Sequence, residues 1–81
     1  MRTIILKGGQ VIYEKETSQV VLPGLDGEFS IMSFHQPLLY RLRKGIVKIA
    51  EREDDPKLKY LQVRDGLAKF DRNTLVILCE K

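Results

Sequence analysis

The chain has 81 residues, of which 43% are hydrophobic and 31% charged, and its formal net charge is +3. This balance excludes a disordered chain, and the length allows one domain that buries only about 60% of the surface exposed by its unfolded chain. The mild positive charge is well short of that of a nucleic-acid-binding tail.

Cys79 is the single cysteine, so no internal disulfide can form, and an unpaired thiol fits a reducing compartment. We expect a buried or neutral side chain there. The first apolar run, residues 4–6, is followed at once by Lys7-Gly8-Gly9 and is too short for a signal peptide. No run approaches the roughly 18 apolar residues that span a bilayer. The sequence therefore predicts a cytosolic or peripheral protein.

A series of short extended runs follows along the chain, each ended by a turn signal. In chain order the runs cover residues 3–7, 11–13, 17–22, 29–31, 38–42, 46–50, 57–63, 67–70 and 74–79. The signals between them include Gly8-Gly9, Pro23-Gly24, Asp26-Gly27, Lys44-Gly45, a charged loop at 51–56, Asp65-Gly66 and Asp71-Arg72-Asn73. Turn signals about every ten residues indicate eight to ten short strands and no helix of useful length, which is typical of an all-β sandwich or barrel.

Several of these runs are apolar on both faces, namely residues 4–6, 20–22 and 75–78. In a free sandwich each strand alternates between apolar residues that face the core and polar residues that face solvent. A two-layer domain of this size has one core, so the second apolar face packs locally at strand ends or meets a partner. We slightly favour a partner.

The sequence offers no convergent set of catalytic or metal-binding residues. His35 is the only histidine, nothing near it would position it in a triad, and Cys79 lies far away in the sequence. One histidine and one cysteine are too few for a metal site, and the glycines lack the spacing of a phosphate-binding loop. We therefore predict no catalytic residue, no metal and no cofactor.

The chain has one basic cluster, formed by Arg41, Arg43, Lys44 and Lys48 with Tyr40 among them. A barrel that binds single-stranded nucleic acid would use such a cluster together with stacking aromatic side chains. A charged edge strand that resists aggregation has the same composition. We favour the edge strand, because the aromatic residues do not interleave with the basic ones, and keep the nucleic-acid-binding barrel as the alternative.

The motif VLPGxxGEF at residues 21–29, followed by HxPLL at residues 35–39, resembles the epsilon subunit of F-type ATP synthases. The N-terminal domain of that subunit carries LPGxxGEFG, then PGHAPLL, then a strand that ends in Lys-x-Gly, where this chain has Arg43-Lys44-Gly45. The closing run at residues 74–78 matches the T-V-L strand of the family. The resemblance covers essentially the whole chain.

The chain departs from the family pattern in its loops. Ser33-Phe34 stands where the family has Pro-Gly, Ser30 where it has a glycine, and Arg64-Asp65 where it has Ser-Gly. These differences affect local loop conformation and not the fold. Most family members continue into a C-terminal helical hairpin. We expect a single sandwich domain over residues 1–81 without that hairpin, and hence neither ATP binding nor inhibition by its helices.

The resemblance implies a ten-stranded β-sandwich of two five-stranded sheets. It implies a non-catalytic rotor subunit that couples the gamma subunit to the membrane c-ring, peripheral to the cytoplasmic face of a bacterial-type inner membrane, with no small-molecule ligand. The implied c-ring contacts are Gly27, Glu28, Phe29, Ser30 and His35. The implied gamma contacts are Lys7, Pro37, Leu38, Leu39 and Tyr40.

Two of these residues keep a structural alternative. Glu28 is expected as an acidic contact to basic residues of the c-ring loops, and the alternative is a solvated carboxylate in a turn. An exposed pair of this kind contributes up to about 1 kcal/mol but fixes register. His35 is expected either to dock or to hold its loop by a hydrogen bond before Pro37, and we slightly favour the second.

Overall fold

The structure is a computed structural model that describes residues 1–55 and 57–80. Pro56, at the end of the predicted charged loop, and Lys81, the last residue of the predicted domain, lie outside the described residues. Nine strands make up the fold: β1 (Arg2–Lys7), β2 (Gln10–Glu16), β3 (Gln19–Gly24), β4 (Gly27–Met32), β5 (Leu38–Leu42), β6 (Gly45–Ala50), β7 (Lys59–Val63), β8 (Gly66–Asp71) and β9 (Thr74–Cys79). As predicted, these residues contain no helix, and thus none that is long and apolar enough to cross a membrane.

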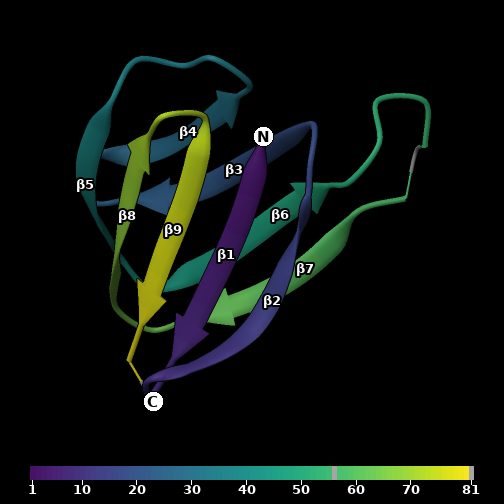
Figure 1. Ribbon diagram of the computed structural model, residues 1–81. Helices are drawn as coiled ribbons and strands as arrows, with labels where there is room; N and C mark the ends of the chain where they lie inside the picture. The colour runs from purple at the N-terminus through teal and green to yellow at the C-terminus, as the bar shows by residue number, and fades with distance from the viewer. Residues whose placement is uncertain (56, 81) are drawn as a thin grey trace.

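The strands form two layers that are joined at one corner (Figure 1). One layer has the order β2-β1-β9-β8-β5, and the other contains β4, β3, β6 and β7 in that order. The layers are connected through the single register pair Gly24↔Leu42, so hydrogen bonding runs through all nine strands as one curled sheet. Antiparallel neighbours predominate, but β1 and β9 run parallel. The all-β expectation is therefore confirmed, whereas ten strands in two five-stranded sheets is wrong for the described residues.

The segment from residue 19 to residue 32 differs from its prediction. The sequence predicts two separate turns, at Pro23-Gly24 and at Asp26-Gly27. The structure has a single hairpin there, formed by β3 and β4. Pro23 and Gly24 end β3, where they pair with Glu28 and Gly27 of β4, and the turn itself is only Leu25-Asp26. Pro23 has no N–H to donate to a neighbouring strand, but its carbonyl oxygen accepts a hydrogen bond from Arg43 N at 2.9 Å across the corner.

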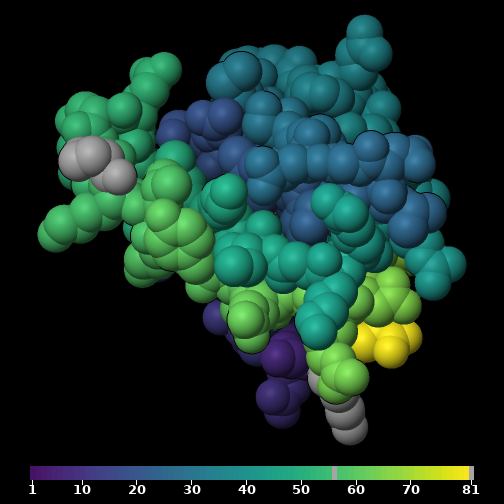
Figure 2. Space-filling view, turned by 180° about the vertical axis from the view of Figure 1, so that it is seen from behind, coloured from purple at the N-terminus to yellow at the C-terminus, as the bar shows by residue number. Residues whose placement is uncertain are grey.

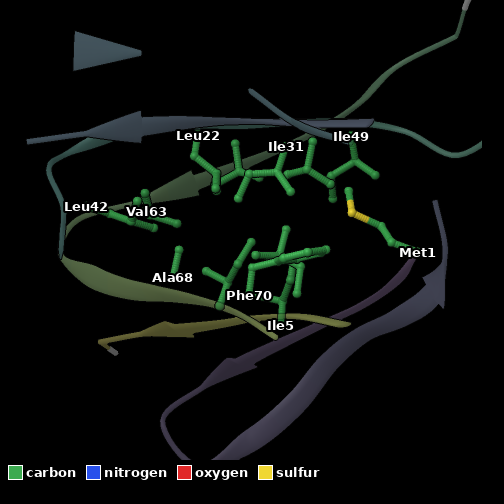
Figure 3. Packing of buried hydrophobic residues seen from close by; sticks show 13 residues of the cluster. Met1, Ile5, Leu22, Ile31, Leu42, Ile49, Val63, Ala68 and Phe70 are labelled. Atoms are coloured by element: carbon green, nitrogen blue, oxygen red, sulfur yellow. The ribbon is translucent and has the colours of Figure 1, made fainter. Parts of the chain in front are cut away.

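The core lies between the two layers (Figure 3). Leu22, Ile31 and Ile49 project from one layer toward Ile5 and Phe70 of the other. The buried hydrophobic cluster comprises Met1, Ile5, Val20, Leu22, Ile31, Leu42, Val47, Ile49, Val63, Ala68, Phe70, Leu75 and Ile77. The alternation of β-strand side chains explains its membership, since buried or half-buried residues alternate with more exposed ones along most of the contributing strands.

Two polar contacts tie the edge strand β2 and the segment that follows it to the rest of the domain. The hydroxyls of Thr3 and Thr17, both buried, lie 2.7 Å apart. The hydroxyl of Tyr13 donates to Glu51 Oε2 at 2.6 Å. Burial, followed by the hydrogen bond to Glu51, raises the pKa of Tyr13 far above its ordinary value. The same hydrogen bond, with Lys15 and Lys59 nearby, lowers the pKa of Glu51.

Candidate docking surfaces

The predicted c-ring contacts lie along one open edge of the sandwich. Residues 27–30 belong to β4, which among the described residues pairs with β3 alone, so its other edge is unpaired. His35 follows in the loop after β4, at the end of this strand that is opposite to Glu28. The five residues therefore do not form one cluster: four lie along β4 and His35 lies in the loop beyond its end. Ser30 is exposed in the middle of this edge.

The side chain of Phe29 points inward from this edge. Its ring centroid lies 4.9 Å from that of Tyr40 on β5, with the planes tilted by 55°. The hydroxyl of Tyr40 donates to Asp26 Oδ2 at 2.8 Å, and this bond raises the pKa of Tyr40 above its ordinary value. Gly24 lies against the Phe29 ring, and there is no room for a side chain at this position. Phe29 and Tyr40 thus brace the corner of the hairpin, although each was expected to contact a partner.

Glu28 is exposed but not isolated. Its carboxylate Oε2 lies 3.3 Å from Lys48 Nζ on β6, and the pair reaches across the intervening β3, where Lys48 is level with Val21 and Glu28 with Pro23. The Glu28 side chain is 53% exposed and the Lys48 side chain 38%, so the pair remains accessible to a partner. Sequence reasoning missed this contact, because it placed Lys48 in the basic cluster.

His35 is exposed and is held by its own loop. Its Nδ1 lies 2.8 Å from the carbonyl oxygen of Gln36, and its backbone N–H donates to the carbonyl of Met32 at 3.2 Å. The imidazole meets the buried Phe70 ring edge-on, with centroids 6.0 Å apart. These contacts favour the loop-holding interpretation, and docking by His35 stays a prediction.

The predicted gamma contacts do not form one patch. Leu38 is half-buried against the core, whereas Leu39 points to the opposite face of β5 and is 69% exposed. Pro37 is exposed in the preceding loop. Lys7 ends β1, where the register Lys7↔Cys79↔Gly66↔Leu42 places it level with the far end of β5. Lys7 is therefore remote from the segment 37–40.

A larger, mainly apolar surface lies on the outer face of the five-stranded layer, where Lys69 and Arg41 separate Leu39 from most of the other apolar residues. One row of directly paired residues crosses four strands, from Val11 through Leu6 and Leu78 to Leu67. Exposed fractions of 54% for Val11, 48% for Leu78 and 42% for Leu67 show that these side chains face solvent. We call this surface the outer apolar face; its members are Ile4, Leu6, Val11, Leu39, Leu67, Val76 and Leu78.

Part of the outer apolar face was predictable. The runs 4–6 and 75–78 are apolar on both faces, and the structure places their second face here. The contributions of Val11 and Leu67 could not be found without the strand order. A hollow of about 340 Å³ lies at one end of the face, beside Leu67, Leu78 and the ion pair of Arg41 with Asp65.

The outer face of the other layer, turned toward the viewer in Figure 2, is built by β3, β4, β6 and β7. It carries the Glu28–Lys48 pair together with the exposed Ile46 and Tyr60.

Within the part of the chain that the structure describes, no three His, Cys, Asp or Glu side chains come together as a metal site would require. Cys79 is half-buried, and burial raises the pKa of its thiol.

Comparison with known proteins identifies close relatives of this sequence. An ATP synthase epsilon chain from Leptospira interrogans is 30% identical over 80 residues, which are 99% of this chain and 61% of the relative. An ATP synthase epsilon chain from Campylobacter concisus is 35% identical over 77 residues, which are 95% of this chain and 57% of the relative. The chain thus spans less than two thirds of the length of these relatives.

Solved structures share the fold. A chain of the central stalk and c-ring of Tetrahymena thermophila mitochondrial ATP synthase aligns with 100% of this chain and 63% of its own length, with a TM-score of 0.81 at 16% identity. A chain of the OSCP/F1/c-ring assembly of Euglena gracilis mitochondrial ATP synthase covers 95% of this chain and 48% of its own, with a TM-score of 0.86 at 14% identity. The family described as ATP synthase, Delta/Epsilon chain, beta-sandwich domain matches residues 1–81. The chain therefore belongs to the beta-sandwich domain family of ATP synthase delta and epsilon chains.

Proposed function

We propose that this chain is a non-catalytic stalk subunit of an F-type ATP synthase and couples the gamma subunit to the membrane c-ring. The observation that carries the proposal is the outer apolar face, which is separate from the polar edge of β4. One small sandwich thus offers two different surfaces, as a coupling subunit between two partners requires.

The outer apolar face suits a permanent protein partner. Its residues come from β1, β2, β5, β8 and β9, so an occupant would contact most of the five-stranded layer at once. A large exposed apolar patch is a liability in a free domain and is typical of a surface that is covered in a complex. We assign this face to gamma, with Leu39 as the member that the sequence also indicated.

The β4 edge suits the polar loops of a membrane ring. Glu28 is accessible there, and its partner Lys48 can be exchanged for a basic residue of the ring, because exposed ion pairs differ little in energy. Such a contact would set the register between the two partners more than their affinity. The location that follows is peripheral to the membrane, through the complex, on the bacterial cytoplasmic side.

Copurification with gamma tests the proposal, and the chain offers a matched pair of variants. Leu67 on the outer apolar face is 42% exposed, and Ile46 on the outer face of the other layer is 41% exposed. We expect Leu67→Glu to weaken gamma binding at least about tenfold, because the carboxylate would lose its hydration when the partner covers this face. Ile46→Glu should bind like the unmodified chain. Equal gamma binding by both variants would remove the assignment of this face.

The nucleic-acid-binding barrel finds less support. Two members of the basic cluster are paired with acids, Arg41 with Asp65 at 3.5 Å and Lys48 with Glu28 at 3.3 Å. The ring of Tyr40 is packed against Phe29 instead of being free to stack on a base. Oligonucleotide binding that weakens steeply with salt would revive this function.

A further inference from the structure

The loop between β4 and β5 presents an aromatic side chain to solvent. Phe34 is 85% exposed, the largest fraction among the large hydrophobic residues that the structure describes. Its backbone has φ 65°, in the left-handed region. That conformation costs a bulky L-residue roughly 1–2 kcal/mol, whereas glycine adopts it freely. Phe34 is therefore unfavourable in two ways, since a large apolar side chain faces solvent and a bulky residue has a left-handed backbone. Neither feature contributes to the core.

Contacts from two other segments hold the loop in this conformation. The backbone N–H of Phe34 donates to Asn73 Oδ1 at 2.7 Å. The hydroxyl of Ser33 accepts from the N-terminal ammonium of Met1 at 3.0 Å. In Figure 1 the β4–β5 loop, the β8–β9 turn and the N-terminus lie at the same end of the sandwich. The exposed ring is thus carried by a tied loop and not by a loose one.

Asn73 is itself placed by the β8–β9 turn. Arg72 and Asn73 are the two residues between the paired Asp71 and Thr74, and both have positive φ, 50° and 57°. This is the twist that a two-residue hairpin needs, and asparagine tolerates it well. Because the Asn73 carbonyl also accepts from Arg2 N at 3.1 Å, the turn is anchored to β1. The side-chain amide of Asn73 is consequently in a fixed position when it meets Phe34.

We propose that Phe34 is a preformed docking anchor at the end of the β4 edge and that Asn73 is its positioning residue. The proposal rests on the proposed function and names the group that carries the c-ring contact: an aromatic ring that enters an apolar pocket between the ring's loops. Strained conformations that the surrounding structure enforces are concentrated at binding sites. A rigid aromatic side chain is also the typical centre of a protein interface, since little entropy is lost when it docks.

A protein surface fits this anchor better than a lipid surface. The nearby basic groups are matched by acids: Arg72 lies 3.9 Å from Asp71, and Arg2 lies 3.0 Å from Glu14. Binding to anionic lipid relies on a cluster of about four to eight uncompensated Lys or Arg residues. A ring held in one orientation recognises a shaped pocket, which a fluid membrane does not provide.

The experiment measures binding of the full chain to two probes, purified gamma and purified gamma bound to the c-ring in detergent. Phe34→Gly should bind gamma like the unmodified chain but bind gamma–c-ring at least about tenfold more weakly, as the loss of an interface anchor does. Its melting temperature should not fall, because glycine relieves the left-handed strain. Tyr60→Gly is the matched control: an aromatic residue 64% exposed on β7, whose loss should leave c-ring binding unchanged.

The positioning role of Asn73 has its own readout. Asn73→Asp keeps an oxygen that accepts from Phe34 N and should bind gamma–c-ring normally. Asn73→Gly keeps the turn but frees the loop, and should weaken that binding several-fold without affecting gamma alone. Normal c-ring binding by Phe34→Gly would overturn the anchor and leave the proposed function intact. If the unmodified chain binds gamma–c-ring no more tightly than gamma alone, the c-ring is not a partner and this part of the proposed function is wrong. Phe34-dependent binding to anionic lipid vesicles without the c-ring would overturn the choice of partner.

Discussion

Replacing Gly24 by alanine should destabilise the domain although Gly24 lies in a strand and not in a turn. The residue does not have a positive φ, so alanine is conformationally acceptable there. The obstacle is space: an added Cβ would lie 2.7 Å from the carbonyl oxygen of Gly27 and 2.7 Å from Cε1 of the Phe29 ring. Neither neighbour can move freely, since one is the backbone of the paired strand and the other packs against Tyr40.

The size of the effect follows from these contacts. Overpacking of this kind costs about 1–3 kcal/mol, and disturbing the aromatic pair adds up to about 1.5 kcal/mol. The lower entropy of the unfolded alanine chain offsets about 0.4–1 kcal/mol. We expect a net loss of about 2 kcal/mol in the free energy of unfolding, which lowers the melting temperature of a domain this small by roughly 8–16 °C.

Urea and thermal unfolding measure this loss, and a double-mutant cycle tests its cause. Phe29→Leu removes the ring that the new methyl group meets, so the losses from Gly24→Ala and Phe29→Leu should add up to more than the loss in the double variant. A change below about 0.5 kcal/mol for Gly24→Ala, or additive losses in the cycle, would refute the steric account.

Three further outcomes are expected. Glu28→Lys should leave the melting temperature nearly unchanged, because its partner Lys48 is exposed, but should lower ATP-driven proton pumping relative to ATP hydrolysis; normal coupling would contradict the c-ring contact. Thr17→Val should cost about 1–2 kcal/mol in urea unfolding, since it leaves a buried threonine hydroxyl without its partner. The lowered pKa of Glu51 predicts a contribution to stability that is present above pH 4.5 and is lost as the pH falls through the pKa of the folded state. The raised pKa of Tyr13 predicts a second loss of stability as the pH rises above 10.0. The alkaline loss of stability should be smaller in Tyr13→Phe than in the unmodified chain, with the remainder due to Tyr40, whose pKa is also raised; an unchanged alkaline loss would exclude Tyr13 as a source.

The sequence was sufficient for the fold class because its signals are local. Alternation of apolar residues and glycine-containing turns located every strand to within a few residues. The motif at residues 21–29 was informative for the family but misleading for the backbone. Gly24 is required by its close approach to Phe29, and a Pro-Gly pair at the end of a strand cannot be distinguished in the sequence from a Pro-Gly turn.

The contacts between residues far apart in the sequence could not be predicted, because they depend on the order of the strands in the sheet. The pairing of Glu28 with Lys48 exists because β3 lies between β4 and β6, and the row from Val11 to Leu67 exists because β9 inserts between β1 and β8. Neither arrangement follows from neighbouring residues along the chain. The left-handed conformation of Phe34 is indicated only by the glycine that the family has at this place, because an aromatic residue itself gives no signal for it.

The parallel pairing of the first and last strands has a mechanical consequence. Arg2 pairs with Thr74 at one end of the ladder and Lys7 with Cys79 at the other. Tension between the start of β1 and the end of β9 would therefore slide the two strands past each other and load the hydrogen bonds of the ladder together, whereas an antiparallel hairpin opens one bond at a time. Such a clamp resists a pulling force well, and its failure would be governed by the unfolding rate and not by the equilibrium stability. The coupling subunit proposed above would benefit from this arrangement, because it would transmit force between two partners.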